Sequence, residues 1–91
     1  MRALFIQTGS VEIRDVPYDI FSVERILSAK NVEIITLPDG IMYGAIEAEE
    51  EGKPRNDLAS LIARREVYGP ALIAGFGNDD VPQSYIDAYM V

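Results

Sequence analysis

The sequence has 91 residues, of which 8 are Lys or Arg and 15 are Asp or Glu, so the formal net charge is −7. It contains no Cys, His or Trp, which excludes disulfides, thiolate nucleophiles, imidazole catalysis and Cys- or His-based zinc sites. This length predicts a single domain over residues 1–91, and 48% hydrophobic residues favour a folded chain over a disordered one.

The first elements are predicted to form a β-hairpin. Residues 3–6 are a continuous apolar run, which is typical of a strand covered on both faces. Residues 8–10 (Thr-Gly-Ser) have turn chemistry, and residues 11–14 alternate apolar and polar side chains. A half-exposed second strand is therefore expected to pair with the first.

A first helix is predicted over residues 19–29. Asp19 is a good N-cap, because its carboxylate can accept hydrogen bonds from the backbone of the first turn. Val23 and Leu27 follow at helical spacing, and Tyr18 could pack on Val23 as a hydrophobic staple.

A second hairpin is expected next. Residues 32–37 are rich in β-branched side chains, residues 38–40 (Pro-Asp-Gly) are a strong turn signal, and residues 41–48 return as a strand. Gly44 inside that strand suggests a bulge or a close backbone approach. The charged residues 49–54 are expected to form a loop.

A second helix is predicted to begin after Asn56 as its N-cap and to end at Gly69, with Pro70 just beyond. Three residues form its expected buried stripe: Leu58, Leu61 and Ile62.

The last third of the chain predicts a strand and a helix. Residues 71–76 are the most apolar run and are expected to form a central strand. After a loop at 77–79, Asp80 is predicted to cap a terminal helix, with Gln83 completing a capping box. Three residues are expected to bury one face of this helix: Ile86, Tyr89 and Met90.

The predicted order is β-β-α-β-β-α-β-α. This order favours an α+β domain with a mainly antiparallel sheet of about five strands and helices packed on one face. No apolar run approaches the length of a membrane span, so the sequence predicts a cytoplasmic protein. The acidic balance argues against direct contact with nucleic acid or anionic membranes, because like charges repel.

Four segments, taken in order, carry a family resemblance: residues 1–6 (MRALFI), 32–40 (VEIITLPDG), 52–59 (GKPRNDLA) and 67–75 (VYGPALIAG). Together they resemble the family catalogued as domain of unknown function 3846, found in phages, plasmids and their bacterial hosts. Two features of that family, a paired Gly after the first helix and a basic residue after the capping Asn, are absent here. The family has no assigned activity, so the resemblance implies a fold, a phage or mobile-element origin and the host cytoplasm.

Two short motifs resemble parts of known ligand sites. Gly75 and Gly77 follow a strand, but Asp80 stands where a dinucleotide-binding fingerprint needs a third Gly, so a simple glycine turn is favoured. Residues 78–80 (Asn-Asp-Asp) offer oxygen ligands without the pattern of a calcium loop. No metal and no cofactor are therefore expected.

Acidic residues before and within the charged loop are the densest charge cluster and predict contact with a basic protein surface. Tyr residues on the last helix are a second candidate contact, for a partner or for self-association. The predicted partner-binding residues are Glu47, Glu49, Glu50, Glu51, Tyr85 and Tyr89.

The composition favours a non-enzymatic phage or mobile-element accessory protein that binds a host protein. Two alternatives remain open. One is an acidic DNA mimic that inhibits a nuclease or DNA-binding protein. The other is a nucleotide-binding or sequestering module, which would use a basic corner near the second helix. That corner consists of Lys53, Arg55, Arg64 and Arg65.

Overall fold

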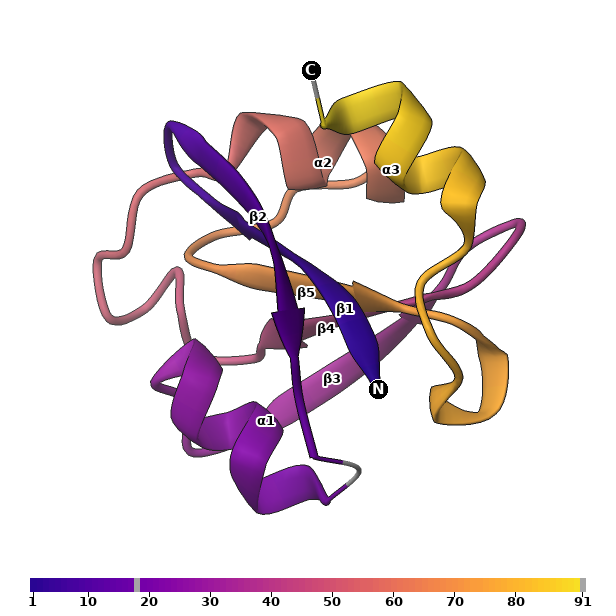
Figure 1. Cartoon of the computed structure of the whole chain (residues 1–91). Helices are drawn as coiled ribbons and strands as arrows, with labels where there is room; N and C mark the ends of the chain where they lie inside the picture. The colour runs from indigo at the N-terminus through magenta and orange to yellow at the C-terminus, as the bar shows by residue number, and fades with distance from the viewer. Residues whose placement is uncertain (18, 91) are drawn as a thin grey trace.

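The computed structural model describes residues 1–17 and 19–90 and contains one five-stranded antiparallel sheet with three α-helices (Figure 1). The strands run in the spatial order β2-β1-β5-β4-β3. This confirms the predicted α+β class, the antiparallel sheet and the order of elements. The strands are β1 (Arg2–Gln7), β2 (Ser10–Asp15), β3 (Val32–Thr36), β4 (Ile41–Ala45) and β5 (Ala71–Ala74). The helices are α1 (Ile20–Leu27), α2 (Asp57–Ala63) and α3 (Gln83–Tyr89), with a 3₁₀ turn η1 (Phe76–Asn78) before α3.

Strand β5 lies at the centre of the sheet, between β1 and β4, as the apolar run predicts. All four of its residues are buried, because both of its edges are paired and both of its faces are covered. The four central residues of β1 are buried for the same reason. β2 is an edge strand, and its Arg14 guanidinium lies 4.7 Å from the centre of the Phe5 ring, which is a cation–π contact.

The helices cover both faces of the sheet, which corrects the prediction that they pack on one face. α1 lies below the sheet in Figure 1 and buries Val23 and Leu27 against Phe5, Tyr43 and Leu72. α2 and α3 lie above it and cover the face that carries Leu4, Ile6 and Met42, among others. Two apolar clusters, one on each side of the sheet, therefore make up the core.

Helix α1 begins as the sequence predicts. The Asp19 carboxylate accepts a hydrogen bond of 2.9 Å from Ser22 N, and this contact is the main cause that lowers the pKa of Asp19. The helix ends at Ser28, whose left-handed φ of 51° closes a turn in which Ser28 N and Ala29 N bond back to the helix. The staple predicted between Tyr18 and Val23 lies outside the described residues.

Helix α2 is shorter than predicted. Asn56 is its N-cap, as expected, but the left-handed cap at the other end is Arg64 and not Gly69. Gly69 also has a positive φ, in the connection to β5. Leu61 is 69% exposed, so its place in the predicted buried stripe is wrong. Ala59 and Ser60 are buried alongside Ile62 instead.

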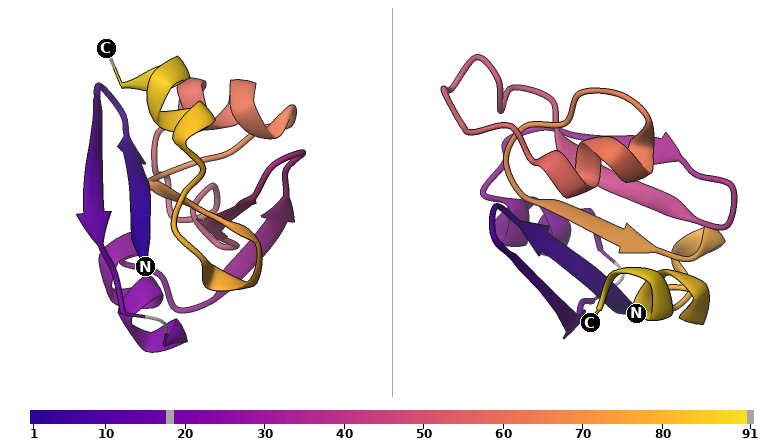
Figure 2. Two further views of the ribbon diagram at one scale, coloured as in Figure 1. Left: turned by 45° about the vertical axis from the view of Figure 1, so that its right-hand side comes forward. Right: turned by 90° about the horizontal axis from the view of Figure 1, so that it is seen from above.

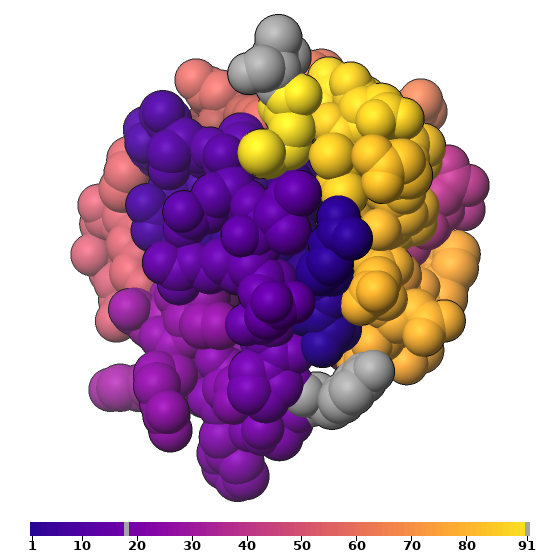
Figure 3. All heavy atoms as spheres, viewed as in Figure 1, coloured from indigo at the N-terminus to yellow at the C-terminus, as the bar shows by residue number. Residues whose placement is uncertain are grey.

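The capping box predicted for α3 is absent from the described residues. The cap position is Pro82, and it makes no side-chain hydrogen bond. The Asp80 carboxylate instead accepts a hydrogen bond of 2.7 Å from Arg2 N, while Val81 N donates to Arg2 O. These bonds join the two ends of the chain, and the N-terminal hairpin and the C-terminal helix share one face of the molecule (Figure 3). Met90 is exposed, so the predicted buried face of α3 is carried by Tyr85 with half-buried Ile86 and Tyr89.

Strand β4 ends at Ala45, three residues before its predicted end at Ala48. Gly44 pairs regularly with Glu33 and Ala71, so it forms no bulge, and no atom lies within 4 Å of the position where a Cβ would stand. No helix in the described residues is long and apolar enough to cross a membrane.

Candidate functional site

The acidic segment after β4 is an ordered turn. Glu51 N donates to Glu47 O, Gly52 N to Glu49 O and Lys53 N to Ala48 O, each at 3.0 Å. Ala48 is buried and anchors the turn to the domain. The side chains of Glu49, Glu50 and Glu51 are exposed. Because the backbone is fixed by these bonds, the turn that carries the three carboxylates has little backbone freedom left to lose on binding.

Glu47 has a different role from its three neighbours. Its Oε1 atom accepts hydrogen bonds from Lys30 N at 2.8 Å and from Asn31 N at 3.4 Å. These bonds tie the connection between α1 and β3 to the acidic turn. They favour the ionised carboxylate, so the bond from Lys30 N is the main cause that lowers the pKa of Glu47. Glu47 therefore holds the turn in place through Oε1, while its buried Oε2 has no hydrogen-bond partner within the described residues.

We expect the stability of the domain to depend on pH through Glu47. Its pKa is lower in the folded chain than the ordinary value of about 4.3. Its stabilising contribution is therefore present above that value and is lost as the pH falls through the lowered pKa. Urea unfolding between about pH 7 and about pH 3 should show a smaller loss of stability for Glu47→Gln than for the wild type.

The control for this prediction is Glu50→Gln, which removes an exposed carboxylate from the same turn. It is expected to follow the wild-type curve. Parallel curves for the wild type and Glu47→Gln would contradict the role assigned to the bonds from Lys30 and Asn31.

Tyr68 is placed beside the acidic turn by a short antiparallel bridge. Tyr68 forms this bridge with Arg55, and it is flanked by hydrogen bonds from Asn56 N to Val67 O at 2.8 Å and from Gly69 N to Pro54 O at 2.9 Å. Partial burial and the carboxylates of Glu49 and Glu66 raise the pKa of the Tyr68 hydroxyl. The hydroxyl is therefore neutral at pH 7 and can donate a hydrogen bond.

A hollow of about 180 Å³ lies between Tyr68 and the end of β4. Ile46, which is 59% exposed, and the carboxylates of Glu49 and Glu66 also line it. Arg65, at its rim, forms an ion pair with Glu33. We call the group formed by Ile46, Glu49, Glu50, Glu51, Glu66 and Tyr68 the acidic corner. It combines negative charge with an exposed aliphatic side chain and an aromatic ring.

The two Tyr residues of α3 lie away from the acidic corner. Tyr85 is only 9% exposed, packs in the core, and accepts a long hydrogen bond of 3.4 Å from Asp39 N. Tyr89 is half-buried, and its ring stacks on that of Tyr85 with the centroids 6.3 Å apart. The acidic turn and α3 are well separated in the right-hand view of Figure 2. The structure therefore places Glu49, Glu50 and Glu51 on one exposed turn, and Tyr85 and Tyr89 lie elsewhere.

Most side chains of the basic corner make hydrogen bonds or ion pairs within the molecule. Lys53 Nζ donates to Ser28 O at 3.1 Å at the end of α1, where a cation also meets the negative end of the helix dipole. Arg55 pairs with Asp57 at 2.8 Å, and Arg65 pairs with Glu33. A hollow of about 490 Å³ does lie beside α2, but Asp57 and Glu66 line it together with the arginines. Its mixed charge gives no preference for a phosphate.

The motif at residues 78–80 is also used inside the molecule. The Tyr43 hydroxyl donates to the Asn78 side chain, and Asp80 bonds to Arg2 N as described above. Within residues 1–17 and 19–90, no three Asp or Glu side chains are grouped so that they could hold a metal ion.

The sequence pattern does not indicate three members of the acidic corner: Ile46, Glu66 and Tyr68. The sequence predicts a strand that includes Ile46, whereas β4 ends at Ala45. Glu66 and Tyr68 come 66 − 51 = 15 and 68 − 51 = 17 residues after Glu51. Comparison of the chain with protein-family models, with curated proteins and with solved structures finds no match. The resemblance to domain of unknown function 3846 stays a prediction from the sequence.

Proposed function

We propose that the protein acts by binding, and that the acidic corner receives a basic segment of a partner protein. The observation that supports this most is the group of three exposed carboxylates on a turn whose backbone is held by its own hydrogen bonds. Lys or Arg side chains are the natural partners of such a group. The lack of His and Cys agrees with a binding role rather than with catalysis.

The apolar part of the acidic corner fits the same kind of partner. Long basic side chains have aliphatic stems that pack on apolar surface while the charged end stays near water or a carboxylate. Ile46 and the Tyr68 ring offer such a surface beside Glu49 and Glu66. An Arg stem across the hollow would reach both a carboxylate and an aromatic ring, which is a favourable place for a guanidinium.

DNA mimicry has less support from the geometry, because many carboxylates are occupied inside the molecule. Asp19 caps α1, and Asp80 holds the N-terminal strand. Three further acids have Arg partners: Glu12, Glu33 and Asp57. The charge available for a partner is therefore local, at one corner. If the resemblance to the phage family holds, the partner is a protein of the bacterial cytoplasm.

The test is a charge-neutralised variant, Glu49→Gln/Glu50→Gln/Glu51→Gln, used as bait in bacterial lysate beside the wild type. Proteins captured by the wild type and lost by the variant are then purified, and their affinities measured. At up to about 1 kcal/mol for each exposed charge pair, we expect the dissociation constant to rise about 10- to 100-fold. Raising the salt concentration should weaken the wild-type complex, because salt screens exposed charges.

A matched control is Glu12→Gln/Asp15→Asn/Asp87→Asn, which also removes three exposed carboxylates but leaves the acidic corner intact. Both variants change the net charge from −7 to −7 + 3 = −4. The control should keep the wild-type affinity. Equal losses in the two variants would show that net charge, and not the acidic corner, determines binding, and would overturn the proposal.

A further inference from the structure

The outer edge of β3 presents unpaired backbone groups. Ile46 N donates to Asn31 O, and Leu37 N donates to Gly40 O. The backbone N–H and C=O groups of the odd-numbered residues in 31–37 therefore point toward β4. Backbone groups alternate between the two sides of a strand. The N–H and C=O groups of Val32, Ile34 and Thr36 therefore point away from the sheet. Within the described chain, no strand or side chain pairs with them.

The two edge strands of the sheet, β2 and β3, differ in how well they are protected against pairing with a further strand. β2 carries Glu12, Arg14 and Asp15 and is exposed over most of its length, and charges on an edge discourage pairing with another strand. β3 has the sequence Val-Glu-Ile-Ile-Thr. Its single charge, Glu33, is paired with Arg65, and Ile34 is 57% exposed. An edge of this kind favours the addition of a further strand.

We infer that β3 pairs antiparallel with β3 of a second copy of this chain, around a two-fold axis at Ile34. In this register Ile34 lies opposite Ile34 of the second copy, and Val32 lies opposite Thr36. About six backbone hydrogen bonds would form between the outward groups. The exposed Ile34 side chains would cover each other on the face that carries α1. Glu33 would lie opposite Ile35, so the register places no like charges directly opposite each other.

Charge at the ends of the paired strands supports the same partner. The two-fold axis brings Asp39, in the turn after β3, toward Lys30 of the second copy, which precedes its β3. Both side chains are exposed, and the contact occurs twice by symmetry. Salt screens these two contacts as well, but the net charge of −7 on each copy is the larger effect and opposes association, so the dimer should become stronger as salt is added. This is the opposite of the salt dependence expected at the acidic corner.

Light scattering during size-exclusion chromatography tests this inference, with loading from about 1 μM to about 1 mM to cover weak, small interfaces. The wild type should approach twice the mass of the chain at the upper end. Ile34→Lys should stay monomeric, because it places two like charges opposite each other. The matched control is Ile13→Lys, which changes a 38% exposed isoleucine on the other edge strand and should dimerise like the wild type. A monomeric wild type at every concentration, or dimers that survive Ile34→Lys, would overturn the inference.

Cross-linking tests the register separately. The chain has no Cys, so single Cys variants report on one position each. In the proposed pairing the two Cα atoms of Ile34→Cys would be about 5.5 Å apart, which a disulfide can span. Those of Thr36→Cys would be about 13 Å apart, which is too far. Rapid oxidation of Ile34→Cys alone is expected, whereas equal rates for the two variants would contradict the register.

Discussion

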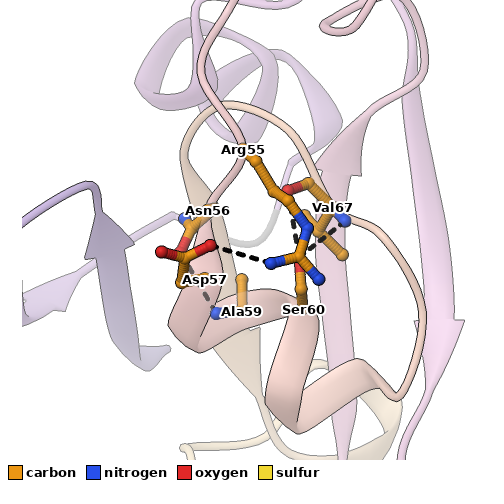
Figure 4. Close-up of polar contacts among 6 residues, drawn as sticks. All are labelled: Arg55, Asn56, Asp57, Ala59, Ser60 and Val67. Atoms are coloured by element: carbon orange, nitrogen blue, oxygen red, sulfur yellow. Dashed lines mark hydrogen bonds and ion pairs between the residues drawn. The ribbon is translucent and has the colours of Figure 1, made fainter.

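The variant Asn56→Ala is expected to lose about 3–5 kcal/mol of its free energy of unfolding. Asn56 is 1% exposed and makes three hydrogen bonds with its side chain. Its Nδ2 atom donates to Ile6 O at 3.0 Å and to Gly69 O at 2.9 Å, and its Oδ1 atom accepts from Ala59 N at 3.1 Å (Figure 4 shows the bond to Ala59). Loss of an N-cap costs about 1 kcal/mol, and loss of the amide donor to each of the two buried carbonyls costs about 1–3 kcal/mol more.

A loss of this size is a large part of the 5–15 kcal/mol that stabilises a typical domain. Urea unfolding followed by circular dichroism would measure it. The control is Asp19→Ala, which removes the exposed N-cap of α1. Since Asp19 performs only the capping function, we expect a loss of about 1 kcal/mol there. Similar losses in the two variants would contradict the role of Asn56 in joining β1 and the Gly69 connection to α2.

Asn56→Asp separates the two functions of the side chain at constant size. An aspartate keeps the oxygen that accepts from Ala59 N, but it places a second oxygen where the amide now donates to Ile6 O and Gly69 O. Two acceptors then face each other in a buried site, and a carboxylate there is costly. We expect Asn56→Asp to be at least as unstable as Asn56→Ala.

The sequence predicted the N-caps Asp19 and Asn56 correctly, because a cap depends on residues about three positions apart, but the same pattern predicted a cap at Asp80 that the structure does not have. It did not predict that Asn56 also bonds to Ile6, which lies 50 residues away. Ser60 is a similar case: its hydroxyl donates to Val67 O at 3.2 Å and accepts from Val67 N at 2.9 Å. Its buried position on α2 has no signal in the hydrophobic pattern, because a polar side chain is expected to face water.

The placement of the helices relative to the sheet was predicted wrongly for a different reason. The apolar run in β1 predicted a strand covered on both faces, and its four central residues are indeed buried. Such a strand needs helices or loops on both sides of the sheet. The element order alone favoured helices on one side, and that prediction was wrong. The apolar run of β1 was more informative than the element order, because a strand without polar side chains must be covered on both faces of the sheet.

The candidate site was predictable only where its residues are adjacent in the chain. Glu49, Glu50 and Glu51 are neighbours, so their charge density was visible in the sequence. Tyr68 reaches them through its bridge to Arg55, which depends on how the connections before and after α2 meet. Glu47 belongs to the same run of acids, yet its carboxylate bonds to Lys30 N. A run of like charges therefore did not reveal which member has a structural role.

The second large effect is expected at Gly40, where Gly40→Ala should lose about 3 kcal/mol of unfolding free energy. A Cβ at this position would stand 2.5 Å from Ala74 O, a distance that real Cβ atoms essentially never show. Ala74 belongs to β5, which is held by β1 on one side and β4 on the other, so its carbonyl cannot move aside without disturbing the sheet. Overpacking of a rigid site typically costs 1–3 kcal/mol and sometimes more.

Gly44→Ala is the matched control, because it makes the same substitution four residues later in the same hairpin. No atom lies within 4 Å of the Cβ position there, and neither glycine has a positive φ. An alanine that fits without strain restricts the unfolded chain, so Gly44→Ala should gain about 0.4–1 kcal/mol. Both variants remove the same backbone freedom, and the difference between them therefore measures the close approach of Gly40 to Ala74. If urea unfolding gave the two variants equal stabilities, the close backbone approach would not be at Gly40.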